Sequence, residues 1–341
     1  MAILVINNAQ GEENLEIDTL HSIVSIATYN VYNGEKTIVK AVKSILNQSY
    51  KGRVEVIIVD DFSKDNSTKI INLRFKNKKN VRLIKSEKNL GLANSLNKGI
   101  ENSQYDLIGI LMCDCELASR NWLRNMVKTI NSDKKIGSVC SRYILPESVW
   151  KEYSFFDKAI FAREYYLSVT GKKKGGKHAL LRKDILKEIN GYDAKSFRIA
   201  GEDVDLMSRI MEKGYNVVLT SNKIMHYHVY YRLNLRKHLF NKALPIGEAI
   251  GVNFRKHGFK SMGNKYWNAF TATFIYIGLF IPVIRWFSLI IVIFSGLIFT
   301  GYFLKYSRDV KAIFLPFFKV VKDIFNIIGF WKGFITNRQK L

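Results

Sequence analysis

Strand and helix signals alternate along the first third of this chain, and that alternation restricts the possible folds more than any other feature. Val54–Val59, interrupted only by Glu55, and Leu107–Met112 are apolar runs, which is typical of strands buried on both faces. Glu35–Asn47 instead places its apolar residues at helical spacing. We therefore expect an α/β fold in which helices cover both faces of a mostly parallel central sheet. The other expected elements are strands at Ile23–Ala27 and Val81–Ile84 and helices at Thr68–Phe75 and Leu92–Ile100.

Polar residues follow three of the expected strands at the point where each strand ends. Thr28-Tyr29-Asn30 follow the first strand, Asp60-Asp61 follow the second, and Asp114-Cys115-Glu116 follow the strand at Leu107–Met112. Ligands of open α/β sheets bind outside the carboxyl ends of the strands. Two carboxylates one residue apart suit a hard divalent cation that also binds diphosphate oxygens. Capping of a nearby helix is the alternative explanation for both acidic pairs.

A second acidic motif, Gly201-Glu202-Asp203, opens a helical pattern that ends at Gly214. The helix dipole favours an ionised carboxylate in the first turn. Such a carboxylate can accept a proton from an attacking hydroxyl group. Ordinary helix-terminus electrostatics is the alternative.

Two further segments, the histidine pair at 226 and 228 and the loop 172–177, carry polar side chains that have more than one functional interpretation. His226 and His228 are alternate residues, so they point the same way if they lie on a strand. They are candidate metal ligands or, alternatively, interface histidines. The loop 172–177 contains four lysines and two glycines, and either holds an acceptor phosphate or is a solvated loop.

In order and spacing, these motifs resemble the family 2 glycosyltransferases of the GT-A fold. The resemblance runs from about Ser22 to His228. The segments that carry it are Thr28-Tyr29-Asn30, Asn33-Gly34-Glu35, Ser44-Ile45-Leu46-Asn47-Gln48, Val59-Asp60-Asp61-Phe62-Ser63, Asn89-Leu90-Gly91, Asn97-Lys98-Gly99-Ile100, Asp114-Cys115-Glu116, Gly191-Tyr192-Asp193 and Gly201-Glu202-Asp203-Val204-Asp205.

The resemblance implies transfer of a sugar from a nucleotide-sugar with inversion at the anomeric carbon. It implies that Asp203 is the general base. It also implies that Asp114 and Glu116 carry Mg²⁺ or Mn²⁺ on the diphosphate, with His226 as a third metal contact and His228 as its competitor. The residues expected to bind the nucleotide-sugar are Thr28, Tyr29, Asn30, Glu35, Asp61, Asn89, Gly91, Asp114, Cys115 and Glu202.

The chain departs from the family pattern at several positions. Glu116 stands where the second Asp is usual, which leaves the metal preference open. Ala27 replaces a common Pro and Leu96 a frequent Arg, so one donor contact is in doubt. The Q-x-x-R-W motif of processive members is missing, because Pro282 stands where Gln should precede Arg285-Trp286. We therefore expect a single sugar addition.

Ala269–Leu304 contains one charged residue, Arg285. About 20 apolar residues span a bilayer as a helix, so we expect a transmembrane hairpin of Trp267–Ile284 and Trp286–Leu304. Flanking lysines and arginines place both ends on the cytoplasmic side. A very apolar core hairpin or a re-entrant element is the alternative.

The part of the chain from His226 onwards is the most basic, with 17 Lys and Arg against 3 Asp and Glu, or +14 of the net +24. Val310–Ile335 mixes aromatic residues with lysines, which suits a helix in the interface of an anionic membrane or a helix packed on the soluble domain. The N-terminus lacks a secretory signal, so we expect a multi-pass protein of the cell membrane with a cytoplasmic catalytic domain. The expected divisions are a lead-in (1–20), the GT-A catalytic domain (21–232), a basic amphipathic segment (233–265), the hairpin (266–305) and an interfacial helix (306–341).

An anchor directly after the catalytic domain favours a lipid-linked acceptor, either a polyprenyl phosphate or a polyprenyl-diphosphate glycan. A cell-surface polysaccharide or a protein glycan is the alternative acceptor. Nucleotidyl transfer is disfavoured because Ser22–Asn30 contains no glycine for a phosphate loop. No nucleic-acid motif accompanies the charge, so we expect no nucleic-acid partner. The cysteines Cys113, Cys115 and Cys140 are too few for a disulfide scaffold, and zinc would need more thiols or imidazoles nearby.

Overall fold

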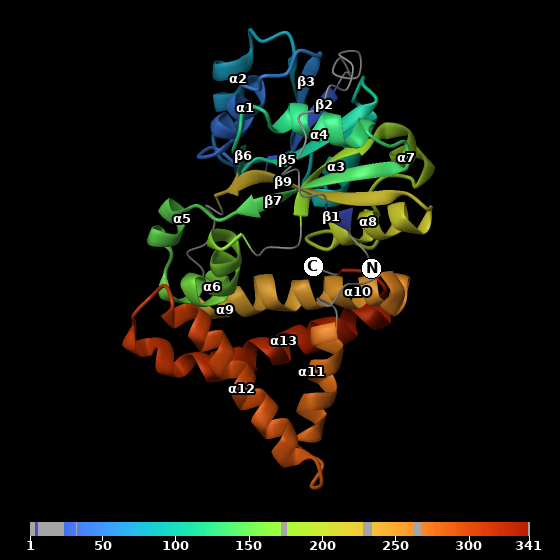
Figure 1. Ribbon diagram of the computed structural model, residues 1–341. Helices are drawn as coiled ribbons and strands as arrows, with labels where there is room; N and C mark the ends of the chain where they lie inside the picture. The colour runs from blue at the N-terminus through green and yellow to red at the C-terminus, as the bar shows by residue number, and fades with distance from the viewer. Residues whose placement is uncertain are drawn as a thin grey trace.

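The computed structural model describes residues 4–5, 24–31, 33–171, 176–227, 234–261 and 267–339. An α/β domain lies on one side of the molecule, and the C-terminal helices form a separate layer beneath it (Figure 1). Residues 172–175, within the lysine-rich loop, and His228 lie outside the described residues.

A nine-stranded mixed sheet forms the centre of the α/β domain, in the order β1-β9-β7-β8-β5-β2-β3-β4, with β6 paired to β9. The strands β2, β3, β4 and β5 run parallel to their neighbours among themselves, as the sequence predicted. The strand β8 is antiparallel to both β5 and β7. The strand bounds are β1 Leu4–Val5, β2 Val24–Val31, β3 Val54–Asp60, β4 Val81–Lys85, β5 Leu107–Met112, β6 Cys115–Leu117, β7 Ile136–Ile144, β8 Gly176–Arg182 and β9 Asn216–His226.

Helices cover both faces of the sheet, because its central strands are apolar on both sides. Val56 and Ile58 face the core that contains α1, α2 and α4. Ile57 and Val59 face the opposite core, which contains α3, α7 and α8. This arrangement confirms the predicted α/β fold. The helix bounds are α1 Ile38–Leu46, α2 Ser67–Phe75, α3 Leu92–Glu101, α4 Trp122–Asn131, α5 Glu147–Glu152, α6 Phe155–Val169, α7 Lys183–Glu188 and α8 Glu202–Glu212.

The C-terminal layer is helical and is joined to the α/β domain at two places. The helix α10 packs against α8, and α12 packs against α6. An aromatic core fills the second junction, where Trp150 and Tyr165 stack with ring centroids 4.4 Å apart. The elements of this layer are α9 Leu235–His238, the π-helical η2 Leu239–Ala243, α10 Leu244–Ser261, α11 Trp267–Gly278, α12 Arg285–Leu304, the 3₁₀ helix η3 Val310–Phe314 and α13 Leu315–Thr336.

Glycines bring α10 and α13 into close contact. A Cβ atom at Gly251 would collide with the carbonyl oxygen of Phe330, and one at Gly333 would collide with that of Glu248. Gly247 and Gly329 meet in the same way one turn earlier. Two G-x-x-x-G patterns therefore let the two backbones approach each other directly. The C-terminal helix is thus packed on the rest of the protein along one side.

The structure contains the second helix of the predicted transmembrane hairpin at full length, but a shorter first helix. The first segment was expected to be helical over Trp267–Ile284, but α11 ends at Gly278 and the chain then turns before Arg285. Twelve helical residues extend about 18 Å, which is less than the roughly 30 Å of a bilayer core. Among the residues that the structure describes, α12 alone is long and apolar enough to cross a membrane. The prediction of two full-length spanning helices was therefore wrong for the first segment.

Candidate active site

Residues after β5 and at the end of β9 form a cluster of candidate metal ligands. The antiparallel pairing of β6 with β9 places Cys115 opposite His226. The Nε2 atom of His226 lies 3.2 Å from Oδ2 of Asp114, and the Cys115 thiol lies 3.7 Å from Oδ1 of the same carboxylate. One ligand atom from each of the three residues lies within 4.8 Å of the others. Asp114 and Cys115 are buried, and His226 is nearly so.

This donor set fits a divalent cation. A carboxylate oxygen and an imidazole nitrogen already converge on one point, and a diphosphate would supply further oxygens. The thiol of Cys115 binds metal only as a thiolate. Asp114 and His226 are therefore the residues that would hold the ion.

Glu116 does not converge with these ligands, although the sequence analysis expected it to bind the metal. Its Oε2 accepts a hydrogen bond of 2.7 Å from the Tyr227 hydroxyl. Burial and this hydrogen bond raise the pKa of Tyr227 to about 12, so the tyrosine remains a donor. The ammonium of Lys40 lies 4.9 Å from the centre of the same ring. In this structure Glu116 therefore binds Tyr227 and does not complete the metal-ligand set.

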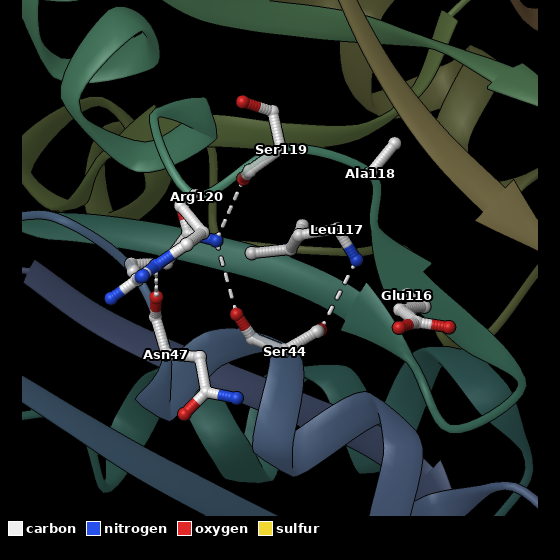
Figure 2. A pocket seen from close by; sticks show the side chains of 8 residues that line it. Ser44, Asn47, Glu116, Leu117, Ala118, Ser119 and Arg120 are labelled. Atoms are coloured by element: carbon white, nitrogen blue, oxygen red, sulfur yellow. Dashed lines mark hydrogen bonds between the residues drawn. The ribbon is translucent and has the colours of Figure 1, made fainter.

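The segment that follows Glu116 is fixed by the C-terminal end of α1. Ser44 accepts a hydrogen bond from the Leu117 amide, and the Gln48 side chain donates to the Ser44 and Ser119 carbonyls. These residues line a pocket of about 390 Å³, with Glu116 at its edge (Figure 2). The motif Ser44–Gln48 therefore positions the loop beside the metal ligands.

Asp203 lies in the first turn of α8, as the sequence predicted. Gly201 caps the helix in the left-handed conformation at φ 92°, and the Val204 amide donates to Asp203 Oδ1 at 2.9 Å. The Asp203 side chain is partly exposed. Glu202, which the resemblance assigned to the donor site, is also partly exposed at the start of this helix. The base candidate is thus held at a helix N-terminus, where an ionised carboxylate is favoured.

Tyr143 on β7 lies beside the metal cluster, and no sequence motif indicated it. Burial raises its pKa well above the usual value, and the charges of Glu164 and Asp203 add to that effect. Its ring meets the His226 ring edge-on, with centroids 5.6 Å apart. Tyr143 therefore lies next to His226 and within reach of the charge of Asp203.

A buried charge cluster supports α8 from the C-terminal layer. Asp205 is fully buried and accepts from Lys256 at 2.5 Å, from His257 at 2.9 Å and from Arg209 at 2.8 Å. Burial alone would raise the pKa of Asp205, but the hydrogen bond with His257 and the charge of Arg209 outweigh it and lower the pKa. Lys256 also binds Asp193 at 2.7 Å. No local sequence pattern indicates these contacts, because 51 residues separate Asp205 from Lys256.

At the end of β3, Asp61 is buried and fixes the loop that contains Asn89 and Gly91. Its two carboxylate oxygens accept from the Leu90 amide at 2.6 Å and the Gly91 amide at 3.0 Å. The Asn89 amide group donates to the Asp61 carbonyl at 3.4 Å. Gly91 has φ 82°, a conformation that suits glycine. The three predicted donor-site residues therefore form one unit.

The other predicted donor-site residues lie at the same sheet edge or near it. The backbones of Thr28 and Tyr29 pair with Leu111 and Met112 at the end of β5, and Asn30 follows on β2. Glu35 lies further out, where its carboxylate accepts from the backbone and side chain of Asn66. Glu35 therefore joins the start of α1 to the start of α2.

Comparison with known proteins places this site in a family. The family model of glycosyl transferase family 2 matches residues 23–189, which contain the ends of β2, β3 and β5. These residues form a glycosyl transferase family 2 domain. The chain is accordingly a transferase.

Curated relatives match only part of the chain. Poly-beta-1,6-N-acetyl-D-glucosamine synthase of Staphylococcus aureus is 28% identical over 126 residues, which are 37% of this chain and 29% of that protein. A glycosyltransferase of Haemophilus influenzae that is itself uncharacterised is 39% identical over 89 residues, 26% of this chain and 35% of that protein. The chain thus spans about a third or less of the relatives it matches.

A solved structure shares the fold over most of the chain. The mannosyltransferase PcManGT from Pyrobaculum calidifontis, in complex with GDP-Man and Mn²⁺, aligns with a TM-score of 0.57 at 15% identity. The alignment covers 91% of this chain and 86% of that one. This similarity confirms the GT-A fold predicted from the sequence.

Two motifs of the family 2 resemblance meet in the structure and have a structural role. The Asn97 side chain donates to the Tyr192 carbonyl and accepts from the Tyr192 amide, both at 2.8 Å. A Cβ atom at Gly191 would lie 2.5 Å from Asn97 Oδ1, so only glycine fits there. The pair connects α3 to the segment before α8.

Proposed function

We propose that this family 2 transferase moves one sugar, with inversion, from a nucleoside-diphosphate sugar to an acceptor. The observation that carries the proposal is the contact of Asp114 with His226, whose ring meets Tyr143, a residue on which the charge of Asp203 also acts. A diphosphate-binding side and a base side thus lie next to each other. Direct displacement needs this arrangement, because the leaving group and the attacking group occupy opposite sides of the anomeric carbon.

We propose Mg²⁺ or Mn²⁺ as the cofactor, with Asp114 and His226 holding it. When bound, the cation would neutralise charge on the departing diphosphate. The fold neighbour was solved with GDP-Man and Mn²⁺, which supports a nucleotide-sugar donor and a divalent ion here. The loop held by Asp61 and the end of β2 would bind the nucleoside.

Asp203 would accept the proton of an attacking acceptor hydroxyl, because its carboxylate is partly exposed in the first turn of α8. If the acceptor is an anionic phosphate, which has no proton to lose, Asp203 would orient it instead. The hydroxyl of Tyr143 keeps its proton at neutral pH and donates a hydrogen bond to Glu164.

We propose a lipid-linked acceptor and attachment of the protein to the cytoplasmic face of the cell membrane. The turn between α11 and α12 exposes large apolar side chains, with Phe280 at 87% and Val283 at 91% exposure. Isolated apolar residues are common on surfaces, but a contiguous apolar patch marks an interaction site. Phe314 and Phe317 extend the apolar surface along η3 and α13. The hairpin and α13 thus form a surface suited to lipid.

A donor screen tests the proposal. Purified full-length protein in detergent is incubated with UDP- and GDP-sugars, with Mg²⁺ or Mn²⁺, and with membrane lipid extract. We expect release of nucleoside diphosphate that requires one donor, one of the two ions and the lipid fraction. Transfer to delipidated polysaccharide or protein glycan alone would overturn the lipid-linked acceptor. Failure to release nucleoside diphosphate from any donor would overturn the proposed reaction.

A further inference from the structure

The loop 196–200 lies directly before the helix that carries the base candidate. Its Arg198 carbonyl accepts from the Leu92 amide at 3.2 Å, and the preceding Gly91 is bound to Asp61. At its other end, Gly201 caps α8, and the Gly201 carbonyl accepts from the Asn253 side chain at 3.1 Å. The loop therefore connects the donor-side unit to the start of α8.

One side chain from the far end of the chain holds this loop. The Oε1 atom of Gln339 accepts from three successive amides, those of Arg198 at 2.8 Å, Ile199 at 2.9 Å and Ala200 at 3.4 Å. Successive amides that point at one place form a concavity for an oxygen or an anion. The backbone amide of Gln339 donates to the Ser196 carbonyl at 2.9 Å, and this bond holds the Gln339 side chain next to the three amides.

Gln339 is itself fixed by the C-terminal layer. Its Nε2 donates to the Pro245 carbonyl at the start of α10, at 3.1 Å, and the residue is only 7% exposed. It follows directly after α13, which the close glycine contacts hold against α10. The position of α13 is therefore transmitted to the loop through the backbone and the side chain of Gln339.

We infer that Gln339 is a positioning residue for Asp203. By holding amides 198–200, it fixes the path of the chain into Gly201 and thus the first turn of α8. The position of Asp203 then depends on the packing of α13, and the first turn of α8 is held in place only when α13 is packed against α10. The expected effect on kcat rests on the proposed function of Asp203. The expected effect on hydrogen exchange in the loop and in α8 does not.

The variants Gln339→Ala and Gln339→Glu separate positioning from general stability. Alanine removes the acceptor, while glutamate keeps an oxygen for the three amides but replaces the donor to the Pro245 carbonyl with a second oxygen. Arg338→Ala is the matched control, because the neighbouring Arg338 is exposed. Hydrogen–deuterium exchange of full-length protein reads the amides of 198–200 and 202–205 directly. Release of nucleoside diphosphate is measured with UDP-N-acetylglucosamine and with GDP-mannose in the presence of Mn²⁺.

For Gln339→Ala we expect faster exchange in both segments and a kcat lowered at least about ten-fold. A displacement of about 1 Å can cost a rate factor on the order of 100. The KM for the donor should change less than about two-fold. Arg338→Ala should resemble the parent protein, and Gln339→Glu should lie nearer to the parent than Gln339→Ala does.

Unchanged exchange in Gln339→Ala would show that Gln339 does not hold the loop. Faster exchange confined to 198–200, or an unchanged kcat, would show that holding the loop does not position α8. If the parent protein releases nucleoside diphosphate from neither donor, the exchange of 202–205 alone decides the inference.

Discussion

The Nε2 atom of His226 lies 3.2 Å from a carboxylate oxygen of Asp114, although 112 residues separate the two in the chain. The pairing of β6 with β9 creates this contact, because it places His226 beside the turn that follows β5. The contact gives the two residues a common task, which we propose is to hold a divalent cation.

Asp114→Asn should weaken Mn²⁺-dependent binding of the donor, because the amide oxygen carries no charge to offer the cation. We expect a loss of at least about ten- to a hundred-fold, the range seen even when a partner of a metal ligand is removed. Isothermal titration of the nucleoside diphosphate with and without Mn²⁺ measures it. Asp133→Asn, an exposed aspartate, is the control. Equal Mn²⁺ dependence in Asp114→Asn and the parent protein would remove Asp114 from the metal site.

His257 should make the junction of α8 and α10 depend on pH. Burial alone would lower its pKa, but hydrogen bonds with Asp205 and Glu212 outweigh burial and raise the pKa above 6.5. The stabilisation by protonated His257 is therefore fully present below about pH 6.5, the unfolded value, and is lost as pH rises through the higher folded value.

Chemical denaturation of the parent protein and His257→Gln at several pH values measures this effect. The parent should be more stable than the variant at about pH 6, and the difference should shrink towards about pH 9. A difference that grows with rising pH would contradict the assignment, since it would require a lowered pKa for His257.

The close contact of α10 with α13 should tolerate no side chain at Gly251. Gly251→Ala forces a methyl group into the Phe330 backbone and should cost about 1–3 kcal/mol of stability, as overpacking does. Gly301→Ala is the matched control, because no atom lies within 4 Å of that Cβ position. Thermal unfolding in detergent compares the two variants. Equal unfolding temperatures would show that α13 is not packed against α10 in this way.

Charges at the tip of the hairpin should weaken attachment to lipid. Phe280 and Val283 are almost fully exposed, so Phe280→Asp with Val283→Asp leaves the packing intact. A charge in the bilayer interior costs roughly 2.5–3.5 kcal/mol. Co-sedimentation with phosphatidylglycerol vesicles should therefore fall at least about ten-fold, while Leu73→Asp, an exposed position on α2, should leave it unchanged. Full retention of vesicle binding by the double variant would place the lipid contact elsewhere.

Local sequence patterns predicted the strands of the fold well where burial on both faces determines the residue types. The apolar runs at Val54–Val59 and Leu107–Met112 correspond to β3 and β5 within one residue, because strands buried on both faces leave few polar positions. The exception within these runs is Glu55, which pairs with Arg82 at 2.9 Å. The end of α11 was missed, because hydropathy alone does not show where an apolar run turns.

The site was predictable only in its local parts. The position of Asp203 in a first helical turn follows from the Gly201 cap and the apolar spacing behind it. The metal-ligand set does not follow from spacing, because β6 alternates its side chains and turns Cys115, not Glu116, towards His226. Gln339, Lys256 and Tyr143 come from distant segments, and only the three-dimensional packing brings them to the site.

The turnover of Asp203→Asn tests the central claim most directly. With the donor identified by the screen, the account predicts a kcat lowered by roughly 10²–10⁴, the usual contribution of a general base, with donor affinity within about two-fold of the parent. Asp184→Asn is the matched control, because that carboxylate also accepts from the following amide in the first turn of a helix. A kcat for Asp203→Asn equal to that of Asp184→Asn and the parent would contradict the account.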